Sequence, residues 1–235
     1  MSFAKVLKEL IESKPAVSPD SLSVRDLLLR AALEEDLQHF EHRDSGVVSV
    51  SVTDLVYCSE KYFMQMKYPE LKIAQNHYPM LIMGRVLHRG LQEILTEYLH
   101  DFVEVEVPVE KSINIELNGL PQIVRVSGRV DALLKDDTVI EFKTSRADHE
   151  LPLEHHVLQL RIYMNITGRN RGILFYINPD RIAEYTITKP LDDNELQQLI
   201  TETLANKKHP RWSWECSYCP YNILCPHKVL QNRRR

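Results

Sequence analysis

The stretch that decides the fold is GRVDALLKDDTVIEFKT, residues 128–144, in which two apolar runs flank the acidic pair Asp136-Asp137. This pattern predicts two antiparallel strands joined by a tight hairpin. Charged side chains interrupt both runs, at Asp131, Glu141 and Lys143. Because side chains two residues apart project from the same face of a strand, Glu141 and Lys143 are expected to share one site.

The register of this hairpin decides whether Asp131 joins that site. A two-residue loop pairs Asp131 with Phe142, which leaves Glu141 on the other face. A three-residue loop sets Asp131 opposite Lys143 and diagonal to Glu141, within reach of one metal ion. A shared site therefore needs the odd register or a bulge. Two crowded carboxylates are costly unless a cation lies between them, and hard oxygen ligands favour Mg²⁺ or Mn²⁺. The competing interpretation is an ordinary exposed Glu–Lys pair.

A helix expected over residues 80–99 carries His88 on the side that faces the core. A lone histidine on such a face is usually a satisfied core residue, but here its imidazole can complete a His, Asp, Glu set of metal ligands. A later helix, over residues 152–166, places Gln159 and Tyr163 four residues apart. Both side chains therefore point the same way, toward a groove or into the core.

The rest of the chain alternates helices and strands, with no internal repeat. Helices are expected over residues 3–14, 23–42, 80–99, 152–166 and 192–206, and strands over 47–52, 102–109, 112–117, 122–134, 138–144, 172–178 and 182–188. Thr53 is expected to cap a helix that carries Tyr57, Cys58, Tyr62 and Phe63. The 80–99 helix is expected to bury one apolar stripe, made of Leu87, Leu91, Ile94 and Tyr98. This order predicts an α/β fold with a mixed central sheet flanked by helices.

Composition sets limits on the class of protein. A chain of 235 residues with 43% hydrophobic residues can bury a core as one domain with appendages. Its longest apolar runs fall far below the roughly 20 residues that span a bilayer, and the N-terminus lacks a signal-peptide pattern, which favours a cytoplasmic protein. The net charge is −4, yet residues 206–235 hold seven lysines and arginines against one acid. Any contact with a polyanion is therefore expected to be local.

The four cysteines are divided unevenly, with one near the start, Cys58, and three near the end, Cys216, Cys219 and Cys225. Without a secretory signal, reduced thiols are favoured over disulfides. One distant and three closely spaced thiolates can hold a metal centre only if both ends of the chain meet beside the core. Zinc competes with iron–sulfur here, because C-x₂-C suits zinc, although zinc sites usually combine two local ligand pairs.

Four motifs in order resemble those of RecB-like nucleases in the PD-(D/E)xK superfamily. They are GRVLHRGL with His88, SGRVDAL with Asp131, VIEFKTS with Glu141 and Lys143, and QLRIY with Gln159 and Tyr163. Together with the cysteine arrangement, residues from about 48 to 230 resemble the CRISPR-associated RecB-like exonucleases that carry an iron–sulfur cluster, the family of the fourth Cas protein. The sequence departs from the family's Cys-Pro-Arg by having Cys58-Ser59-Glu60. That departure puts DNA contacts at this point in doubt.

The resemblance implies a restriction-endonuclease-like core over residues 46–206. It follows an N-terminal helical extension, residues 1–45, and precedes a basic cluster-binding segment, residues 207–235. The implied cofactors are an iron–sulfur cluster on the four cysteines, with [4Fe–4S] ahead of [2Fe–2S], and Mg²⁺ or Mn²⁺. The implied metal ligands are the side chains of His88, Asp131 and Glu141 and the backbone carbonyl of Phe142.

The resemblance also implies roles and partners. Lys143 stabilises the charge that develops on the phosphate, and Gln159 and Tyr163 position the DNA strand or the lysine. The implied activity is exonuclease cleavage of single-stranded DNA ends, with trimming of prespacer DNA beside the integrase proteins of CRISPR adaptation. The alternative is a module that holds DNA ends for a nuclease, helicase or integrase complex with little catalysis of its own.

Overall fold

The computed structural model describes residues 23–41, 48–75, 78–145 and 150–229, so the helix expected over residues 3–14 lies outside the described residues. The strands are β1 (Ser49–Ser51), β2 (Val103–Leu117), β3 (Leu120–Leu134), β4 (Thr138–Thr144), β5 (Arg171–Ile177) and β6 (Ile182–Ile187). The helices are α2 (Val24–Glu41), α3 (Val52–Val56), α4 (Ser59–Lys67), α5 (Glu70–Gln75), α6 (Pro79–Leu99), α7 (Glu154–Thr167), α8 (Asp193–Leu204) and α9 (Glu215–Tyr218), with a 3-10 turn η2 (His100–Phe102).

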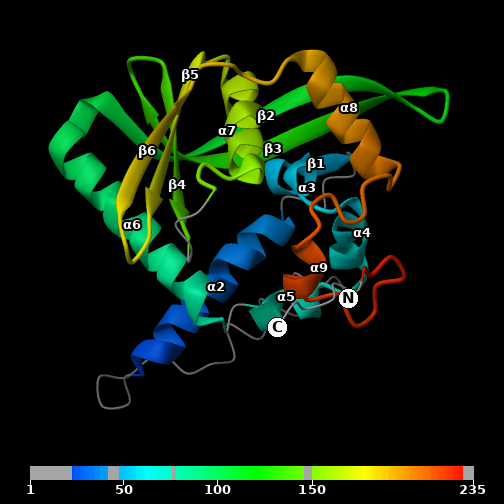
Figure 1. Ribbon diagram of the computed structural model, residues 1–235, viewed down its shortest axis with the longest axis horizontal. Helices are drawn as coiled ribbons and strands as arrows, with labels where there is room; N and C mark the ends of the chain where they lie inside the picture. The colour runs from blue at the N-terminus through cyan, green and yellow to red at the C-terminus, as the bar shows by residue number, and fades with distance from the viewer. Residues whose placement is uncertain (1–22, 42–47, 76–77, 146–149, 230–235) are drawn as a thin grey trace.

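All six strands form one mixed sheet in the order β1-β3-β4-β5-β6, with β2 paired to β3. The pairs β1–β3 and β4–β5 are parallel, and the pairs β2–β3, β3–β4 and β5–β6 are antiparallel. Helix α6 packs on one face, whereas α3, α7 and α8 cover the other (Figure 1). The predicted α/β fold with a mixed, helix-flanked sheet is confirmed. In the described part of the chain, no helix is both long and apolar enough to cross a membrane.

The long hairpin β2–β3 turns its apolar side from one face of the sheet to the other. On β2, Val107 packs in the large core under α7, but Val105 packs in the smaller core under α6. On β3, Val130 and Ala132 divide between the same two cores. Residues two apart in a regular strand share a face, so both strands make a half-turn here. Glu106, with φ of 54°, lies at this point and adopts a conformation rare for residues other than glycine.

The hairpin β3–β4 has the parity that a shared site requires. Its register pairs Ala132 with Ile140 and Leu133 with Val139. When continued by one residue, this register sets Asp131 opposite Glu141. The expected pairing was with Lys143, two residues further along, so the register differs but the parity is the same. Beyond that point β4 stays paired with β5 alone, which leaves its outer backbone open to the Asp131 side chain.

Two predictions about α3 and α4, the helices that follow β1, are wrong. Ser51, not Thr53, caps α3: its hydroxyl accepts the Asp54 N–H at 3.1 Å, and the Asp54 carboxylate accepts the Ser51 N–H at 2.8 Å. These reciprocal bonds start the helix two residues earlier than expected. The helix also ends at Val56, so Tyr57 and Cys58 lie between α3 and α4 rather than on one helix. A second capping box, Asp192 with Glu195, is present at the start of α8.

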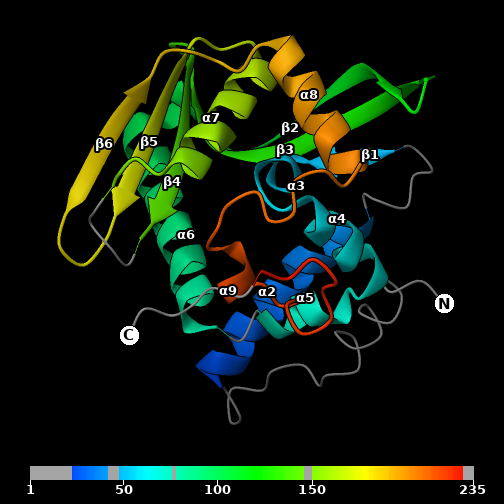
Figure 2. The ribbon, with the colours of Figure 1, turned by 45° about the vertical axis from the view of Figure 1, so that its right-hand side comes forward.

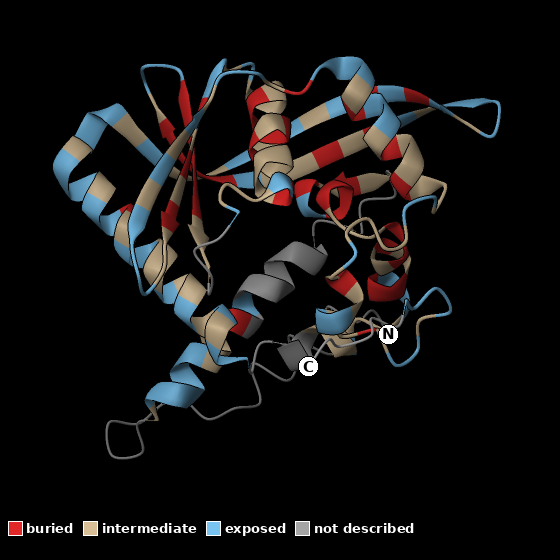
Figure 3. Ribbon diagram, viewed as in Figure 1, coloured by how far each residue is buried: buried red, intermediate tan, exposed pale blue. Residues whose placement is uncertain are grey.

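The expected apolar stripe of α6 is only half buried. Leu91 packs against the sheet together with Leu95, but Ile94 is 53% exposed and Tyr98 is 77% exposed. Figure 3 shows that the end of α6 nearest η2 is largely exposed. Helical periodicity identified the correct helix but not how far the sheet extends beneath it. The break expected in the strand at residues 110–111 is also absent, because β2 is continuous.

Gly128 lies where β3 meets α7, and there we expect substitution to be costly. A Cβ on Gly128 would approach the Tyr163 ring to 2.7 Å and a Val52 methyl to 3.0 Å, so Gly128→Ala must displace a buried ring. We expect a loss of about 1–3 kcal/mol in the free energy of unfolding. Gly90 in α6 is the matched control, since a Cβ there meets nothing within 4 Å. Gly90→Ala should stabilise the helix by up to about 1 kcal/mol, measured by denaturant unfolding. Equal effects of the two substitutions would contradict this packing.

Candidate active site

Four charged side chains named from the sequence come together where α6 crosses the ends of β3 and β4. His88 Nδ1 lies 3.2 Å from Asp131 Oδ1, and Asp131 Oδ2 accepts the backbone N–H of Phe142 at 2.7 Å. Lys143 Nζ donates to Glu141 Oε1 at 2.8 Å. Because Asp131 lies where β3 changes face, one of its oxygens contacts α6 and the other contacts β4. The two predicted halves of the site are therefore joined through Asp131.

Gln159 of α7 fixes the relation between the lysine and the glutamate. Its Oε1 accepts from Lys143 Nζ at 2.8 Å, and its Nε2 donates to Glu141 Oε1 at 2.9 Å. Of the two roles considered for Gln159, holding the lysine is the one that these contacts support. Tyr163, one turn further along α7, is buried next to Gly128. It lies behind Gln159, and burial followed by the charge of Glu141 raises the pKa of its hydroxyl, which stays neutral.

The electrostatics of the site are dominated by burial and by two carboxylates. Burial, and then the charge of Asp131, raise the pKa of Glu141 to about 7. Burial lowers the pKa of His88, but the hydrogen bond and charge of Asp131 outweigh it, and the net pKa is raised. Burial also lowers the pKa of Lys143, and the charges of Glu141, Tyr57 and Asp131 reverse that effect. For His88 and Lys143 these directions report excess negative potential, whereas for Glu141 the charge of Asp131 adds to the effect of burial.

The donor chemistry of these residues fits a hard divalent cation. Glu141 Oε2 is buried and has no hydrogen-bond partner among the described residues, which is costly for a carboxylate. A cation placed beside it would relieve both this cost and the repulsion from Asp131. In the described ranges, no three His, Cys, Asp or Glu side chains already surround one point as ligands. The Lys143 ammonium instead holds Glu141 Oε1.

Sequence reasoning missed a second polar group beside the site. Gln92, one turn after His88 on α6, donates to Glu106 Oε1, and Arg129 Nε lies 2.6 Å from Glu106 Oε2. Glu106 is the β2 neighbour of Asp131 at the point where both strands change face. The only sequence signal was the i, i+4 spacing of His88 and Gln92, because positive φ at a glutamate is not predictable from its identity.

Sequence reasoning also missed an aromatic group beside Lys143. His155 and His156 begin α7, and burial, followed by the charge of Lys143, lowers their pKa values to about 4 and about 2. Both are therefore neutral at pH 7. The His155 ring lies 5.8 Å from the Tyr57 ring and 4.9 Å from the Trp214 ring, measured between centroids. The adjacent histidines were visible in the sequence, but nothing there indicated that two distant segments meet them.

The four cysteines line one cavity of about 280 Å³ between α4 and the C-terminal segment. All four are free thiols. Burial, with a smaller contribution from the charges of Glu215 and Cys219, raises the pKa of Cys58 to about 11. Burial also raises the pKa of Cys219, as do its neighbours Cys225 and Cys216. The thiols are therefore close enough to repel as anions, which is the condition under which a shared cation stabilises them.

Most of the chain matches the model of a known protein family. The family model of the PD-(D/E)XK nuclease superfamily matches residues 37–226. The chain belongs to this superfamily.

Within the superfamily, the nuclease is similar to CRISPR-associated exonuclease Cas4 of Saccharolobus solfataricus (strain ATCC 35092 / DSM 1617 / JCM 11322 / P2). The two are 39% identical over 210 residues, which are 88% of this chain and 99% of that protein. The crystal structure of SSO0001 superimposes with a TM-score of 0.77 at 38% identity, covering 89% of this chain and 99% of that chain. This PD-(D/E)XK chain is thus a member of the Cas4 family, as the motifs predicted.

In this PD-(D/E)XK nuclease, a buried glutamate joins the two cysteine-bearing segments. Glu215 Oε1 accepts the backbone N–H of Cys58 at 2.7 Å. Its Oε2 accepts the N–H groups of Arg211 and Trp212, both at 2.8 Å. The residue after Glu215 is Cys216, so one carboxylate orders the backbone on both sides of the cavity. We call Glu215 and these three N–H groups the clasp.

The departure from Cys-Pro-Arg has a structural counterpart. Ser59 Oγ contacts Asn206 Oδ1 at 2.9 Å and accepts the Lys208 N–H at 3.0 Å. Glu60 Oε2 accepts from Asn206 Nδ2 at 2.5 Å. Figures 1 and 2 both show the C-terminal segment, orange to red, beside α4 and α5. The two residues that replace Pro-Arg therefore hold the C-terminal segment.

Proposed function

We propose that this nuclease is a metal-dependent exonuclease that hydrolyses phosphodiester bonds at single-stranded DNA ends. The observation that carries the proposal is the buried Glu141 Oε2 beside Asp131 and Lys143, which has no hydrogen-bond partner in the described part of the chain. A binding protein gains nothing from crowding two carboxylates at the ends of paired strands, whereas a phosphodiesterase needs them to hold a cation. The name of the 39% identical relative supports the exonuclease class.

The residues divide the chemistry between them. When bound by His88, Asp131, Glu141 and the Phe142 carbonyl, Mg²⁺ or Mn²⁺ supplies Lewis-acid polarisation of the scissile phosphate and lowers the pKa of water. The chain itself orients the ligands: the Phe142 N–H fixes Asp131 Oδ2, and Gln159 fixes Glu141 Oε1. These contacts make the site rigid before substrate arrives.

Lys143 is the fixed positive charge of the site. An ammonium has three N–H groups, and two of them are directed at Glu141 and Gln159. The third can donate to a phosphate oxygen as negative charge grows there. A point charge held in this way stabilises the transition state more than the ground state. Tyr163 supports Gln159 from behind, and DNA positioning by Gln159 and Tyr163 acts through the lysine.

We further propose that Cys58, Cys216, Cys219 and Cys225 hold an iron–sulfur cluster, [4Fe–4S] in preference to [2Fe–2S]. The fit rests on four free thiols that line one cavity and repel one another as anions. The cluster then joins a nuclease core, residues 46–206, to a basic segment, residues 207–235, with residues 1–45 as an N-terminal extension. The relative's CRISPR association supports a role in trimming prespacer DNA beside integrase proteins.

The test of function is digestion of end-labelled single-stranded DNA with Mn²⁺, with Mg²⁺ or with EDTA. We expect products that shorten stepwise from an end in Mn²⁺ or Mg²⁺ and no digestion in EDTA. Circular single-stranded DNA of the same length is the control, and it should stay intact because it has no end. Cleavage of the circle would contradict exonuclease action. Tight DNA binding without cleavage in any cation would instead identify a DNA-end-binding module.

A further inference from the structure

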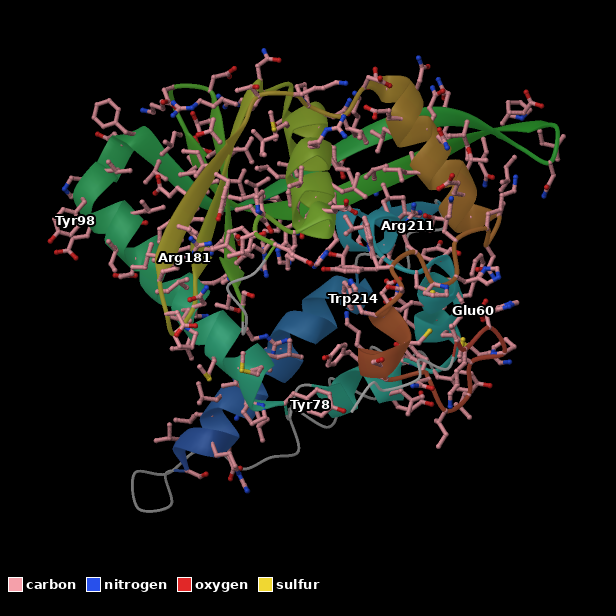
Figure 4. The ribbon with its side chains drawn as sticks, in the orientation of Figure 1. Glu60, Tyr78, Tyr98, Arg181, Arg211 and Trp214 are labelled. Carbon is pink, nitrogen blue, oxygen red and sulfur yellow. The ribbon has the colours of Figure 1, made fainter. Side chains whose placement is uncertain are left out.

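A line of aromatic rings leads away from Lys143 to the molecular surface. Tyr57 lies close enough to Lys143 and Glu141 for both charges to act on its hydroxyl. Its ring centroid lies 6.2 Å from that of Trp214, and Trp214 lies 6.4 Å from Tyr218. Tyr218 is 71% exposed, whereas Tyr57 and Trp214 are half-buried. Figure 4 labels Trp214 beside α9. The rings thus lead from Tyr57, on which the charge of Lys143 acts, through Trp214 to the exposed Tyr218.

Positive charge accompanies these rings. Lys61 Nζ lies 5.6 Å from the centroid of the Tyr57 ring, and Lys61 and Lys228 line the cysteine cavity together with Trp214 and Tyr218. Aromatic faces interspersed with ammonium groups are the usual composition of a surface that binds single-stranded nucleic acid. Bases stack on the rings and phosphates lie against the lysines. This composition also answers why a negatively charged chain can hold a polyanion at this place.

Core packing accounts for the neighbouring ring of Trp212 and contributes to the position of Tyr57, but it does not account for Tyr218. Trp212 is fixed by a hydrogen bond of 2.8 Å from its Nε1 to the Val56 carbonyl, and its ring lies against His155. That ring is a structural part of the junction between α3 and the C-terminal segment. Tyr218 buries little of its ring, so burial of apolar surface does not explain an aromatic residue at that position.

We infer that Tyr57, Trp214 and Tyr218 form a stacking platform for unpaired bases of the strand whose end occupies the catalytic site. The inference rests on the proposed function and deepens it, because it gives a reason for single-strand selectivity. Bases in a duplex are already paired and stacked on each other, so their faces are not open to protein rings. An unpaired strand exposes those faces along the path to Lys143.

The experiment measures binding in EDTA, which separates it from cleavage. Two fluorescent oligodeoxynucleotides of equal length are compared, one with bases throughout and one with an abasic tract. The wild-type chain should bind the complete strand about fivefold to a hundredfold more tightly for each stacked base. Tyr218→Ala and Trp214→Ala should each reduce this preference by the factor of one stacked base. The matched control is Tyr98→Ala on α6, since Tyr98 is equally exposed but lies far from the site (Figure 4).

Further variants and measurements test the stacking platform and the proposed nuclease activity separately. Tyr218→Phe and Trp214→Phe should retain the preference for bases, because a π face remains. Iron content and thermal midpoint of every variant show whether the cysteine cavity is intact. Equal weakening on complete and abasic strands, or an equal effect of Tyr98→Ala, would overturn the platform. Base-dependent binding together with no cleavage in Mn²⁺ would leave the platform standing and overturn the proposed nuclease activity.

Discussion

Replacing Glu141 with Gln is expected to reduce metal-dependent cleavage of single-stranded DNA by at least about a thousandfold. A carboxylate that binds a catalytic cation contributes several kcal/mol to transition-state stabilisation, and each 1.36 kcal/mol is a factor of ten in rate. Gln keeps the shape and one acceptor oxygen for Lys143, so the hydrogen bonds now made by Glu141 Oε1 remain partly available. The change therefore removes charge without creating a cavity. Asp131→Asn should act in the same direction.

Stability separates a catalytic loss from a folding loss. Glu141 is buried beside another carboxylate, so Glu141→Gln should leave the thermal midpoint in EDTA unchanged or higher. Initial rates on end-labelled DNA and the thermal midpoint are measured on the same preparations. Glu110→Gln is the control, because Glu110 is an exposed carboxylate on β2 that has no part in the site. Wild-type rates in both Glu141→Gln and Asp131→Asn would refute the assignment.

The charged core of the site was predictable because strand geometry leaves few options. Glu141 and Lys143 must share a face, and the odd parity needed to bring Asp131 beside them is the parity that β3 and β4 adopt. The position of His88 followed from helical periodicity, which placed it on the side of its helix that faces the core. Local periodicity therefore limited the possible arrangements, and the resemblance to RecB-like nucleases favoured the one in which these residues meet. It did not show that Asp131 lies at a change of face, because that depends on positive φ at Glu106.

What sequence reasoning missed depends on long-range contacts. Glu215 bonds to a backbone N–H 157 residues away, and nothing in its neighbours signals that partner. The exposure of Tyr98 likewise depends on where the sheet ends beneath α6, which periodicity does not report. The capping residue of α3 was a different kind of miss, because Ser51 and Asp54 stand in the sequence at capping-box spacing. Thr53 was a plausible N-cap only as long as the pairing of Ser51 with Asp54 was overlooked.

Cys58→Ser is expected to abolish bound iron and lower the free energy of unfolding, yet to leave residues 206–216 in place. A cluster on Cys58 and Cys216 closes a loop of about 160 residues, and the entropy of such a closure amounts to roughly 4 kcal/mol. The clasp already closes nearly the same loop through Glu215 and the backbone N–H of Cys58, which Ser retains. Cys58→Ser should therefore lower the free energy of unfolding by less than the full cost of loop closure. We expect a loss of about 2 kcal/mol. Proteolysis should begin within residues 217–229.

The clasp and the cluster can be separated by a double-mutant cycle. Glu215→Gln removes the charge that orders three backbone N–H groups, and alone it should weaken iron retention while the thiols remain. Combined with Cys58→Ser, it leaves this segment held only by the remaining contacts, such as those of Ser59 and Glu60 with residues 206–208. The loss in the double variant should therefore exceed the sum of the two single losses, and proteolysis should reach Asn206. Iron content, thermal midpoint and cleavage sites are measured for all four proteins. Additive losses, or cleavage at Asn206 in Cys58→Ser alone, would show that the cluster and not Glu215 holds this segment.

A colourless wild-type chain with one zinc would show instead that the thiols hold zinc, because C-x₂-C at Cys216 and Cys219 suits either metal.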